Sequence, residues 1–221
     1  ILYETVVRNP RAVIVLATGH SPRLAYRYFV QRVQENRTDV RGVTFVKLDE
    51  WLGLSDADSA TCEYFLREEI IRPLRVAPEK YLHFDAQAAD APAECSRVEA
   101  AYAALEQIDL VVLGIGMNGH LGLNEPGESL IGPAHVIALD EKTKTHEMLT
   151  HTEKPVRYGV TLGMENLFRG RHILLLADGA QKEAALGCYL GGRLTTKAPV
   201  SLLKLHPNCT CIINRESFGD L

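Results

Sequence analysis

The sequence predicts an α/β fold: a three-layer, mostly parallel Rossmann-like sheet with helices on both faces. Short runs of valine, isoleucine and leucine alternate with helical stretches along the whole chain, as expected for parallel strands buried on both faces. Polar or glycine-containing turns follow several of these runs, and such turns are where open α/β sheets bind ligands. The 221 residues contain no repeat and no low-complexity linker, so we expect a single domain over 1–221.

The composition is that of an ordinary globular protein. A net charge of -4 without a run of Lys or Arg argues against nucleic-acid binding, and no apolar segment approaches the roughly 20 residues that span a bilayer. The five cysteines are scattered without paired zinc-ligand spacing, which indicates reduced thiols in a cytoplasmic protein. The chain begins with Ile1, so we expect residues before it, and targeting signals there cannot be judged.

The first predicted strand covers 13–17 and leads into a short polar turn. Ser21 as N-cap and Pro22 at the first helical position predict a helix that runs to about Asn36. A strand, a glycine-bearing turn and a helix N-terminus together present backbone N–H groups to an anion, and Thr18 adds a hydroxyl donor. Although this signal is weak by itself, it suggests a phosphate cradle. Its candidate residues are Thr18, Gly19, His20 and Ser21.

The second predicted strand covers 42–48 and is followed directly by Asp49 and Glu50. Asp49 is expected on the ligand edge of the sheet. Glu50 is equally compatible with a solvated side chain and with a group that supports the site. A helix over 60–74 and a short strand over 81–84 come next.

A helix over 91–107 leads into 110–128, the stretch with the most candidate catalytic side chains. Its apolar start, 110–113, predicts a buried strand, and the glycines after it allow tight turns with positive φ. His120 and Glu125 are five residues apart, so an imidazole and a carboxylate can converge on one substrate atom. The alternative is a polar turn in which His120 caps a neighbour. The glycine spacing and the NEPG turn favour the functional interpretation.

In the second half of the chain, residues 140–157 are polar and only weakly periodic. A lid over a site has this pattern, and so does a plain surface helix, which is the safer interpretation for most of these side chains. Lys182 falls in the first turn of a predicted helix, where a cation is unfavourable, so it is expected to hold an anion; a solvent-facing lysine is the alternative. The other predicted elements are strands over 133–139, 158–162, 172–177 and 209–214, a helix to about 190, and a short helix or turn over 202–205.

The polar clusters at 18–22, 49–50, 118–125 and 178–182 all follow predicted strands, so we expect them to meet at one edge of the sheet. This set of residues suits a phosphorylated small molecule handled by acid–base chemistry. It lacks a nucleophilic serine elbow, a metal cluster and a dinucleotide-binding turn, so neither a metal nor a cofactor is expected.

Aldose–ketose isomerisation is one reaction that fits these residues. It needs a carboxylate that takes a proton from a carbon beside a carbonyl, and a second group that moves protons on the sugar oxygens. Asp49 suits the first task, and His120 with Glu125 suits the second.

The stretches VKLDEW, GIGMNGHLGLNEPGESL, GVTLGMENL, GAQK and LKLHPN together resemble the glucosamine-6-phosphate deaminase/isomerase family. The resemblance extends from about Val13 to Asn214, and its GHxxxNEP pattern after a GIG strand is specific. LDEW, NGHLGLNEPGESL and HEML look most like the galactosamine-6-phosphate branch. The resemblance implies that galactosamine 6-phosphate becomes tagatose 6-phosphate and ammonia. A sugar phosphate is the implied small-molecule partner, and a homo-oligomer is compatible with it.

The resemblance also implies a role for each candidate residue. Asp49 matches the base that moves the C2 proton, His120 the acid/base that opens the sugar ring, and Glu125 its carboxylate partner. Lys182 and the turn 18–21 match the phosphate binders.

Three departures from the family pattern stand out. The glucosamine branch has Asp where this chain has Asn118, whose amide oxygen can orient the imidazole without adding charge. The family's lid arginine falls near Leu149, so we expect that its phosphate contact is either absent or supplied by another group such as His146 or Lys144. No basic residues of the family's allosteric site match in 129–138, so we expect no activation by an amino sugar.

Three further functions stay open alongside the galactosamine 6-phosphate reaction. The first is a glucosamine-6-phosphate deaminase. The second is a 6-phosphogluconolactonase-like hydrolase on the same fold, which would keep the Gly-His loop without needing Asp49. The third is a sensor that binds sugar phosphates without turnover, which the amide at Asn118 makes conceivable. Ammonia release from a hexosamine 6-phosphate separates the deaminases from the other two.

Overall fold

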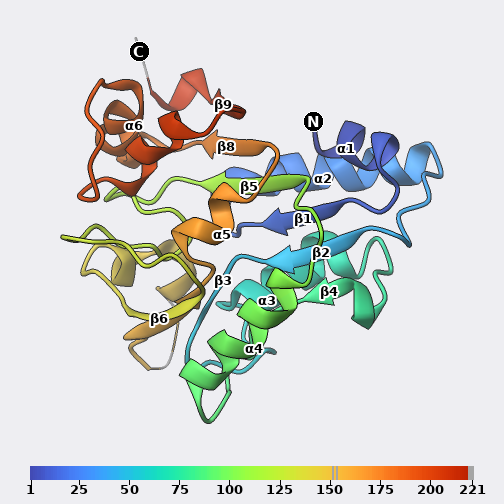
Figure 1. Cartoon of the computed structure of the whole chain (residues 1–221), viewed down its shortest axis with the longest axis horizontal. Coiled ribbons are helices and arrows are strands. Elements are labelled where there is room, and N and C mark those ends of the chain that lie inside the picture. The colour runs from blue at the N-terminus through green and yellow to red at the C-terminus, as the bar shows by residue number, and fades with distance from the viewer. Residues whose placement is uncertain (151, 153, 219–221) are drawn as a thin grey trace.

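A parallel sheet of six strands forms the centre of the computed structural model, which describes residues 1–150, 152 and 154–218 (Figure 1). Val15 pairs with Val46 on one side and with Val111 on the other, so the first strand of the chain is central. The predicted fold class is therefore confirmed. In order across the sheet, the strands are β4 (Tyr81–Leu82), β2 (Thr44–Lys47), β1 (Val13–Leu16), β5 (Leu110–Gly114), β8 (Ile173–Ala177) and β9 (Cys209–Ile213).

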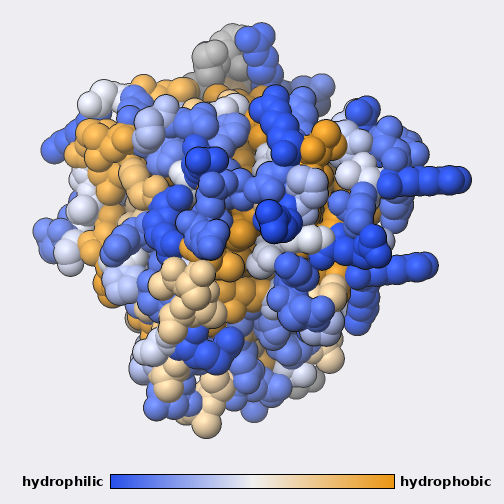
Figure 2. Space-filling view, turned by 45° about the vertical axis from the view of Figure 1, so that its right-hand side comes forward, coloured by the Kyte–Doolittle hydropathy of each residue, from blue (hydrophilic) through white to orange (hydrophobic). Residues whose placement is uncertain are grey.

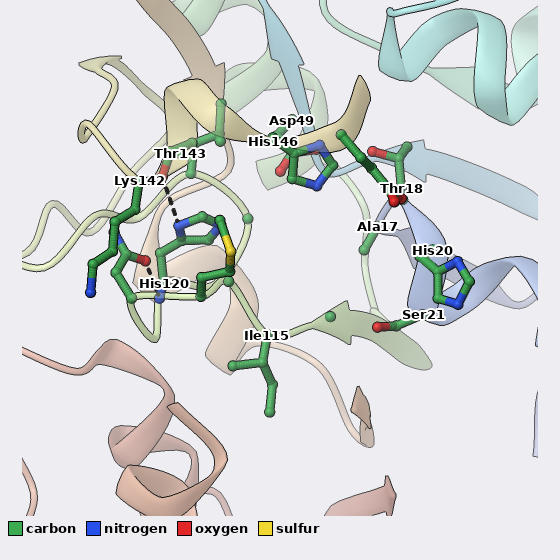
Figure 3. Close-up of a pocket in the computed structure, with 18 of the residues that line it drawn as sticks. Ala17, Thr18, His20, Ser21, Asp49, Ile115, His120, Lys142, Thr143 and His146 are labelled. Atoms are coloured by element: carbon green, nitrogen blue, oxygen red, sulfur yellow. Dashed lines mark hydrogen bonds between the residues drawn. The ribbon is translucent and has the colours of Figure 1, made fainter. Parts of the chain in front are cut away.

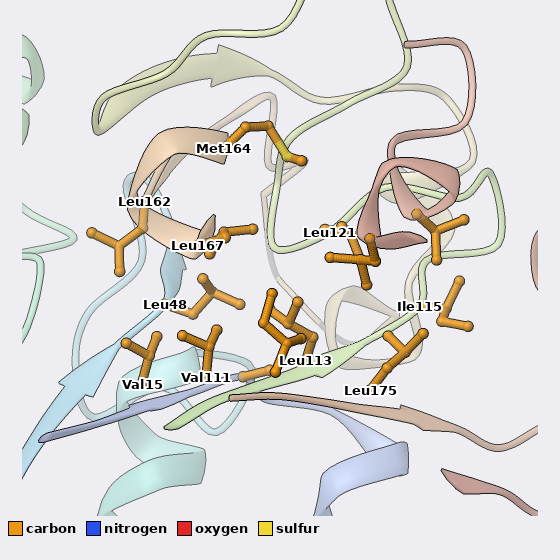
Figure 4. Packing of buried hydrophobic residues seen from close by; sticks show 14 of the residues in the cluster. Val15, Leu48, Val111, Leu113, Ile115, Leu121, Leu162, Met164, Leu167 and Leu175 are labelled. Atoms are coloured by element: carbon orange, nitrogen blue, oxygen red, sulfur yellow. The ribbon is translucent and has the colours of Figure 1, made fainter. Parts of the chain in front are cut away.

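Helices cover both faces of this sheet because successive strand residues point to opposite sides. Ile14 and Leu16 pack on one side with α1 (Leu2–Arg8), α2 (His20–Glu35) and α3 (Cys62–Leu66). Val13 and Val15 pack on the other side, in the cluster that Figure 4 shows in part. That second cluster includes residues of α4 (Ala91–Ala103), α5 (Met164–Phe168), α6 (Glu183–Leu190) and the 3-10 helix at Pro199–Leu205.

A second, antiparallel sheet was not predicted. It consists of β3 (Asp49–Trp51), β7 (Tyr158–Thr161) and β6 (His135–Ala138) in that order. The predicted strands near 133–139 and 158–162 exist, but they pair here instead of joining the large sheet. Between β2 and β3 only Leu48 separates the two sheets, and it bonds to both: its N–H donates to Leu16 and its carbonyl accepts from Leu162. This crossing places Asp49 at the carboxyl end of β2.

Several helix boundaries differ from the predicted ones. α2 begins at His20 with Gly19 as its N-cap, so Ser21 is not the cap. The predicted 60–74 helix is shorter: α3 continues as a π-helical turn over Arg67–Ile71. In the region predicted as lid or surface helix, the described residues form two 3-10 helices, Thr143–Thr145 and Glu147–Leu149. Positions 151 and 153 of that region lie outside the described residues.

The surface in Figure 2 is mostly hydrophilic, with hydrophobic residues in smaller groups between the polar ones. None of the described helices combines the length and the apolar character that crossing a bilayer requires. The exposed large hydrophobic residues include Leu24 and Tyr28, one turn apart on α2.

Candidate active site

A cavity of about 290 Å³ lies at the carboxyl edge of the large sheet. The segments after β1, β2, β5 and β8 all contribute to its lining, as predicted, and residues from 142–150 complete it. Figure 3 labels residues after β1, β2 and β5 and residues of 142–150 around the cavity. Over the described part of the chain, no group of three or more His, Cys, Asp or Glu side chains is placed to hold a metal ion. Of the predicted site residues, those that line the cavity are Thr18, Gly19, His20, Ser21, Asp49, Asn118, His120 and Lys182.

Asp49 is a buried carboxylate at the cavity wall. It is the first residue of β3 and is 8% exposed. Burial raises the pKa of Asp49 to about 7, and the charge of Glu50 adds to the rise, while His120 and other groups oppose it. A carboxyl group with this pKa exchanges a proton readily near neutral pH.

His120 and Glu125 form the predicted imidazole–carboxylate pair. His120 Nδ1 lies 3.3 Å from Glu125 Oε2 and 3.2 Å from the Thr143 hydroxyl oxygen. Burial alone would raise the pKa of Glu125, but hydrogen bonds and the charge of His120 lower it to about 2. The ring packs directly on Gly116, where a β-carbon would overlap it. Glu125 therefore stays ionised behind the ring and fixes which imidazole nitrogen faces it.

Asn118 acts differently from the prediction. Its amide oxygen accepts the backbone N–H of His120 at 3.2 Å, so it does not orient the imidazole ring. Its amide nitrogen donates to Glu125 Oε2 at 2.8 Å. The Asn118 amide therefore positions the Glu125 carboxylate, which in turn positions the His120 ring.

The turn after β1 (Thr18–Ser21) is here called the phosphate turn because the sequence predicts a phosphate there. It faces Lys182, which follows β8. Gly19 has φ +97°, a left-handed conformation suited to glycine. Lys182 Nζ donates to Ser21 Oγ at 2.8 Å, so the solvent-facing alternative for this lysine is wrong. Burial lowers the pKa of Lys182, although Glu147 and Asp178 oppose the change.

His20 occupies the outer side of the phosphate turn. Its side chain is 62% exposed, and Nε2 lies 3.2 Å from Asp178 Oδ2. Asp178 is held in turn by the Ser217 hydroxyl at 2.6 Å and by the Asn214 amide at 3.0 Å. The C-terminal segment therefore supports the turn from outside.

Residues of the 142–150 segment line the cavity, and they form two short 3-10 helices instead of one plain surface helix. Leu149, near the position of the family's lid arginine, is buried in a hydrophobic cluster with Trp51. His146 lies beside Gly19 and against the Trp51 ring, and burial lowers its pKa to about 4. Lys144 pairs with Glu141 instead. His146 is therefore the one of the two predicted substitutes that reaches the cavity.

A buried ion network below the cavity was missed. Lys47 Nζ lies 2.8 Å from Glu50 Oε2 and 2.9 Å from Glu63 Oε2, and all three side chains are fully buried. The solvated interpretation of Glu50 is therefore wrong, because its carboxylate accepts backbone N–H groups of α3. A lysine inside the apolar strand GVTFVKL was the available signal, since a buried cation requires a partner. Cys62, another lining residue, was also missed.

Comparison with known proteins identifies the family of the chain. Residues 2–212 match the family model of glucosamine-6-phosphate isomerases/6-phosphogluconolactonase. An Escherichia coli (strain K12) protein named "Putative deaminase AgaI" is 43% identical over 96% of this chain and 84% of its own length. A glucosamine-6-phosphate deaminase of Thermoanaerobacter pseudethanolicus is 33% identical over 98% of this chain and 87% of its own.

Solved structures of similar proteins lead to the same family. A monomeric glucosamine-6-phosphate deaminase has a TM-score of 0.92 at 32% identity, covering 97% of this chain and 90% of that one. A 6-phosphogluconolactonase from Trypanosoma brucei shares the fold, with a TM-score of 0.73 at 23% identity over 97% of this chain and 88% of its own. The chain therefore belongs to the glucosamine-6-phosphate isomerase/6-phosphogluconolactonase family, and within it to the amino-sugar phosphate deaminases/isomerases.

Proposed function

We propose that this chain converts galactosamine 6-phosphate to tagatose 6-phosphate and ammonia. The observation that carries the proposal is that one cavity is lined by a buried carboxylate, by an imidazole that Glu125 holds from outside the lining, and by a turn and a lysine suited to an anion (the anion seat). A hexose 6-phosphate presents a reacting carbon at one end and a dianion at the other, so this arrangement matches its two ends. The similarity to deaminases over nearly the whole chain supports the same reaction class.

The phosphate group would be bound at the phosphate turn and by Lys182. The backbone N–H groups at the start of α2 and the helix dipole favour an anion there. Lys182, now donating to Ser21, can redirect its ammonium to a phosphate oxygen and form a charge-assisted hydrogen bond. His146, beside Gly19, is placed to add a further donor from the 142–150 segment.

The reaction begins at the other end of the cavity. His120 moves a proton between the 1-hydroxyl and the ring oxygen, so the sugar opens to an aldehyde. Glu125 keeps the ring oriented and stabilises the imidazolium that forms during transfer. Asp49 then takes the proton from C2 while the His120 imidazolium protonates the aldehyde oxygen, which gives an enolamine. Asp49 returns its proton to C1, and an iminium is left at C2. Water hydrolyses this iminium to the ketone and ammonia.

Two of the other functions, the lactonase and the sensor, are less well supported. Lactone hydrolysis would not need a buried base such as Asp49, and the lactonase named above is below 25% identity. A sensor without turnover was conceivable because of Asn118. However, the Asn118 amide donates to Glu125, and Glu125 still pairs with His120. The carboxylate–imidazole unit needed for proton transfer is thus present.

The test is an assay of ammonia release with galactosamine 6-phosphate and glucosamine 6-phosphate side by side, with hydrolysis of 6-phosphogluconolactone measured in parallel. We expect ammonia and tagatose 6-phosphate from the galactosamine substrate at the higher kcat/KM. Faster release from the glucosamine substrate would make the chain a glucosamine-6-phosphate deaminase. Lactone hydrolysis without ammonia would make it a lactonase, and binding without either product would make it a sensor.

A further inference from the structure

Cys62 lies between two parts of the proposed site. It is 2% exposed and lines the cavity at the start of α3. The Thr18 hydroxyl donates to Cys62 Sγ at 3.0 Å, and the thiol is in range to donate to Asp49 Oδ1 at 3.7 Å. The sulfur therefore connects the phosphate turn to the buried carboxylate.

The backbone around Cys62 is firmly held, so the thiol has a defined position. Glu50 Oε1 accepts the Cys62 N–H at 3.0 Å, and Glu50 Oε2 accepts the Glu63 N–H at 2.8 Å. Lys47 donates to the same Glu50 carboxylate at 2.8 Å. Thr61 caps α3 through its hydroxyl. The ion network below the cavity thus fixes the residue that carries the thiol.

The thiol is a donor at neutral pH. Burial raises the pKa of Cys62 well above its usual value, and the charges of Glu50 and Asp49 raise it further. A protonated thiol can donate one hydrogen bond. That bond favours the ionised form of Asp49, so it opposes the rise in the pKa of Asp49 that burial causes.

We propose that Cys62 is a positioning residue for Asp49: its thiol holds one carboxylate oxygen and favours the ionised form that accepts the substrate proton. This inference rests on the proposed function, in which Asp49 moves the C2 proton. The other titratable groups that face Asp49 are left unchanged in every variant below. They are Glu50 on β3, Lys47 on β2, His120 after β5, Tyr26 on α2 and His146 in the 142–150 segment.

The experiment compares Cys62→Ala and Cys62→Ser with the parent protein and with Cys95→Ala. Cys95 is also buried, on α4, and does not line the cavity. The first readout is the pH dependence of kcat/KM for ammonia release. The second is a carbon-13 titration of aspartate carboxyl groups, in which the Asp49 signal is identified by its loss in Asp49→Asn.

We expect Cys62→Ala to move the acidic limb of kcat/KM, and the Asp49 titration midpoint, upward by about 0.5 to 1 pH unit. Cys62→Ser keeps a donor, so both values should lie at or below those of the parent; Cys95→Ala should leave them unchanged. An unmoved Asp49 midpoint in Cys62→Ala, or an equal rise in Cys62→Ser, would overturn the inference. If the proposed function is wrong, the parent protein will release no ammonia. The carbon-13 titration of Asp49 would still test its contact with the Cys62 thiol in that case.

Discussion

Asp49 and Glu50 are neighbours in sequence but have opposite surroundings. Glu50 is paired with Lys47 and accepts three backbone N–H groups, those of Trp51, Cys62 and Glu63. The hydrogen-bond donor at the Asp49 side chain is a weak one, the Cys62 thiol. A carboxylate that is buried with so little stabilisation binds a proton more tightly than usual. Glu50 therefore supports the structure, whereas Asp49 is available for chemistry.

Replacing Asp49 by Asn should lower kcat by about 10²- to 10⁴-fold with little change in KM, because the lost group acts in the transition state. In the parent, kcat/KM should rise as the pH rises through about 7, since only the ionised carboxylate accepts a proton. That rise should be absent from the residual activity of Asp49→Asn. Ammonia release measured from pH 5 to 9 checks both points, and a near-normal rate in the variant would remove Asp49 from the mechanism.

Lys182→Ala should raise KM for the sugar phosphate by about 10- to 100-fold, because a charge-assisted hydrogen bond to the phosphate is lost. The matched control is Lys197→Ala, since Lys197 is exposed, pairs with Glu128 and does not line the cavity. Initial rates against substrate concentration provide the measurement. Equal KM values in the two variants would show that Lys182 does not bind the phosphate.

Among the elements, the loop after β5 owes its shape to close packing. Gly116 accepts the N–H of Gly119 and donates to the carbonyl of His120, so the loop folds back on itself. The imidazole lies flat on Gly116 as a result. The identity of a single small residue therefore determines where the ring can sit.

Gly116→Ala should reduce kcat at least about 10-fold, because the added methyl group must push the His120 ring away from Glu125. Gly187→Ala is the control: the new β-carbon there meets no atom within 4 Å, and Gly187 does not line the cavity. Kinetics and thermal unfolding of both variants give the comparison. If Gly116→Ala were as active as Gly187→Ala, the ring position would not matter for turnover.

The connection between β2, β3 and α3 depends on the buried ion network. Lys47→Met should lower the free energy of unfolding by about 3–5 kcal/mol, because it leaves the Glu50 carboxylate buried without its cation and Glu63 with the partly exposed Arg67 as its ion-pair partner. Arg41→Met breaks the exposed pair with Asp39 and should cost about 0–1 kcal/mol. Urea unfolding of both variants measures the difference. Similar losses would mean that burial does not strengthen this network.

At the scale of the whole molecule, what could be predicted depended on the kind of signal. Buried parallel strands are continuous apolar runs, so the ends of the strands could be predicted from the sequence. It followed that the residues after these strands lie together at one edge of the sheet. The small sheet could not be predicted in this way, because only one residue, Leu48, separates β2 in the large sheet from β3 in the small one. The 142–150 segment shows only weak periodicity in its sequence, because its 3-10 helices are too short to repeat a hydrophobic pattern.

Side-chain partners in the site were harder to predict than strand positions. Nothing local shows that Lys47 would reach Glu63, which is 16 positions away. Which end of the Asn118 amide faces Glu125 likewise depends on the folded loop. The roles of Asp49, His120 and Glu125 rested on the resemblance and on residue chemistry, and they remain proposals until the variants above are measured.

The bond between Ser21 and Lys182 joins residues that are 161 positions apart. During translation, the phosphate turn leaves the ribosome early and has no ammonium to face until most of the polypeptide has followed it. A truncated product that stops before β8 would lack half of the anion seat, however well its first strands had paired. Under the proposed function, the complete anion seat therefore exists only after Lys182 has been synthesised.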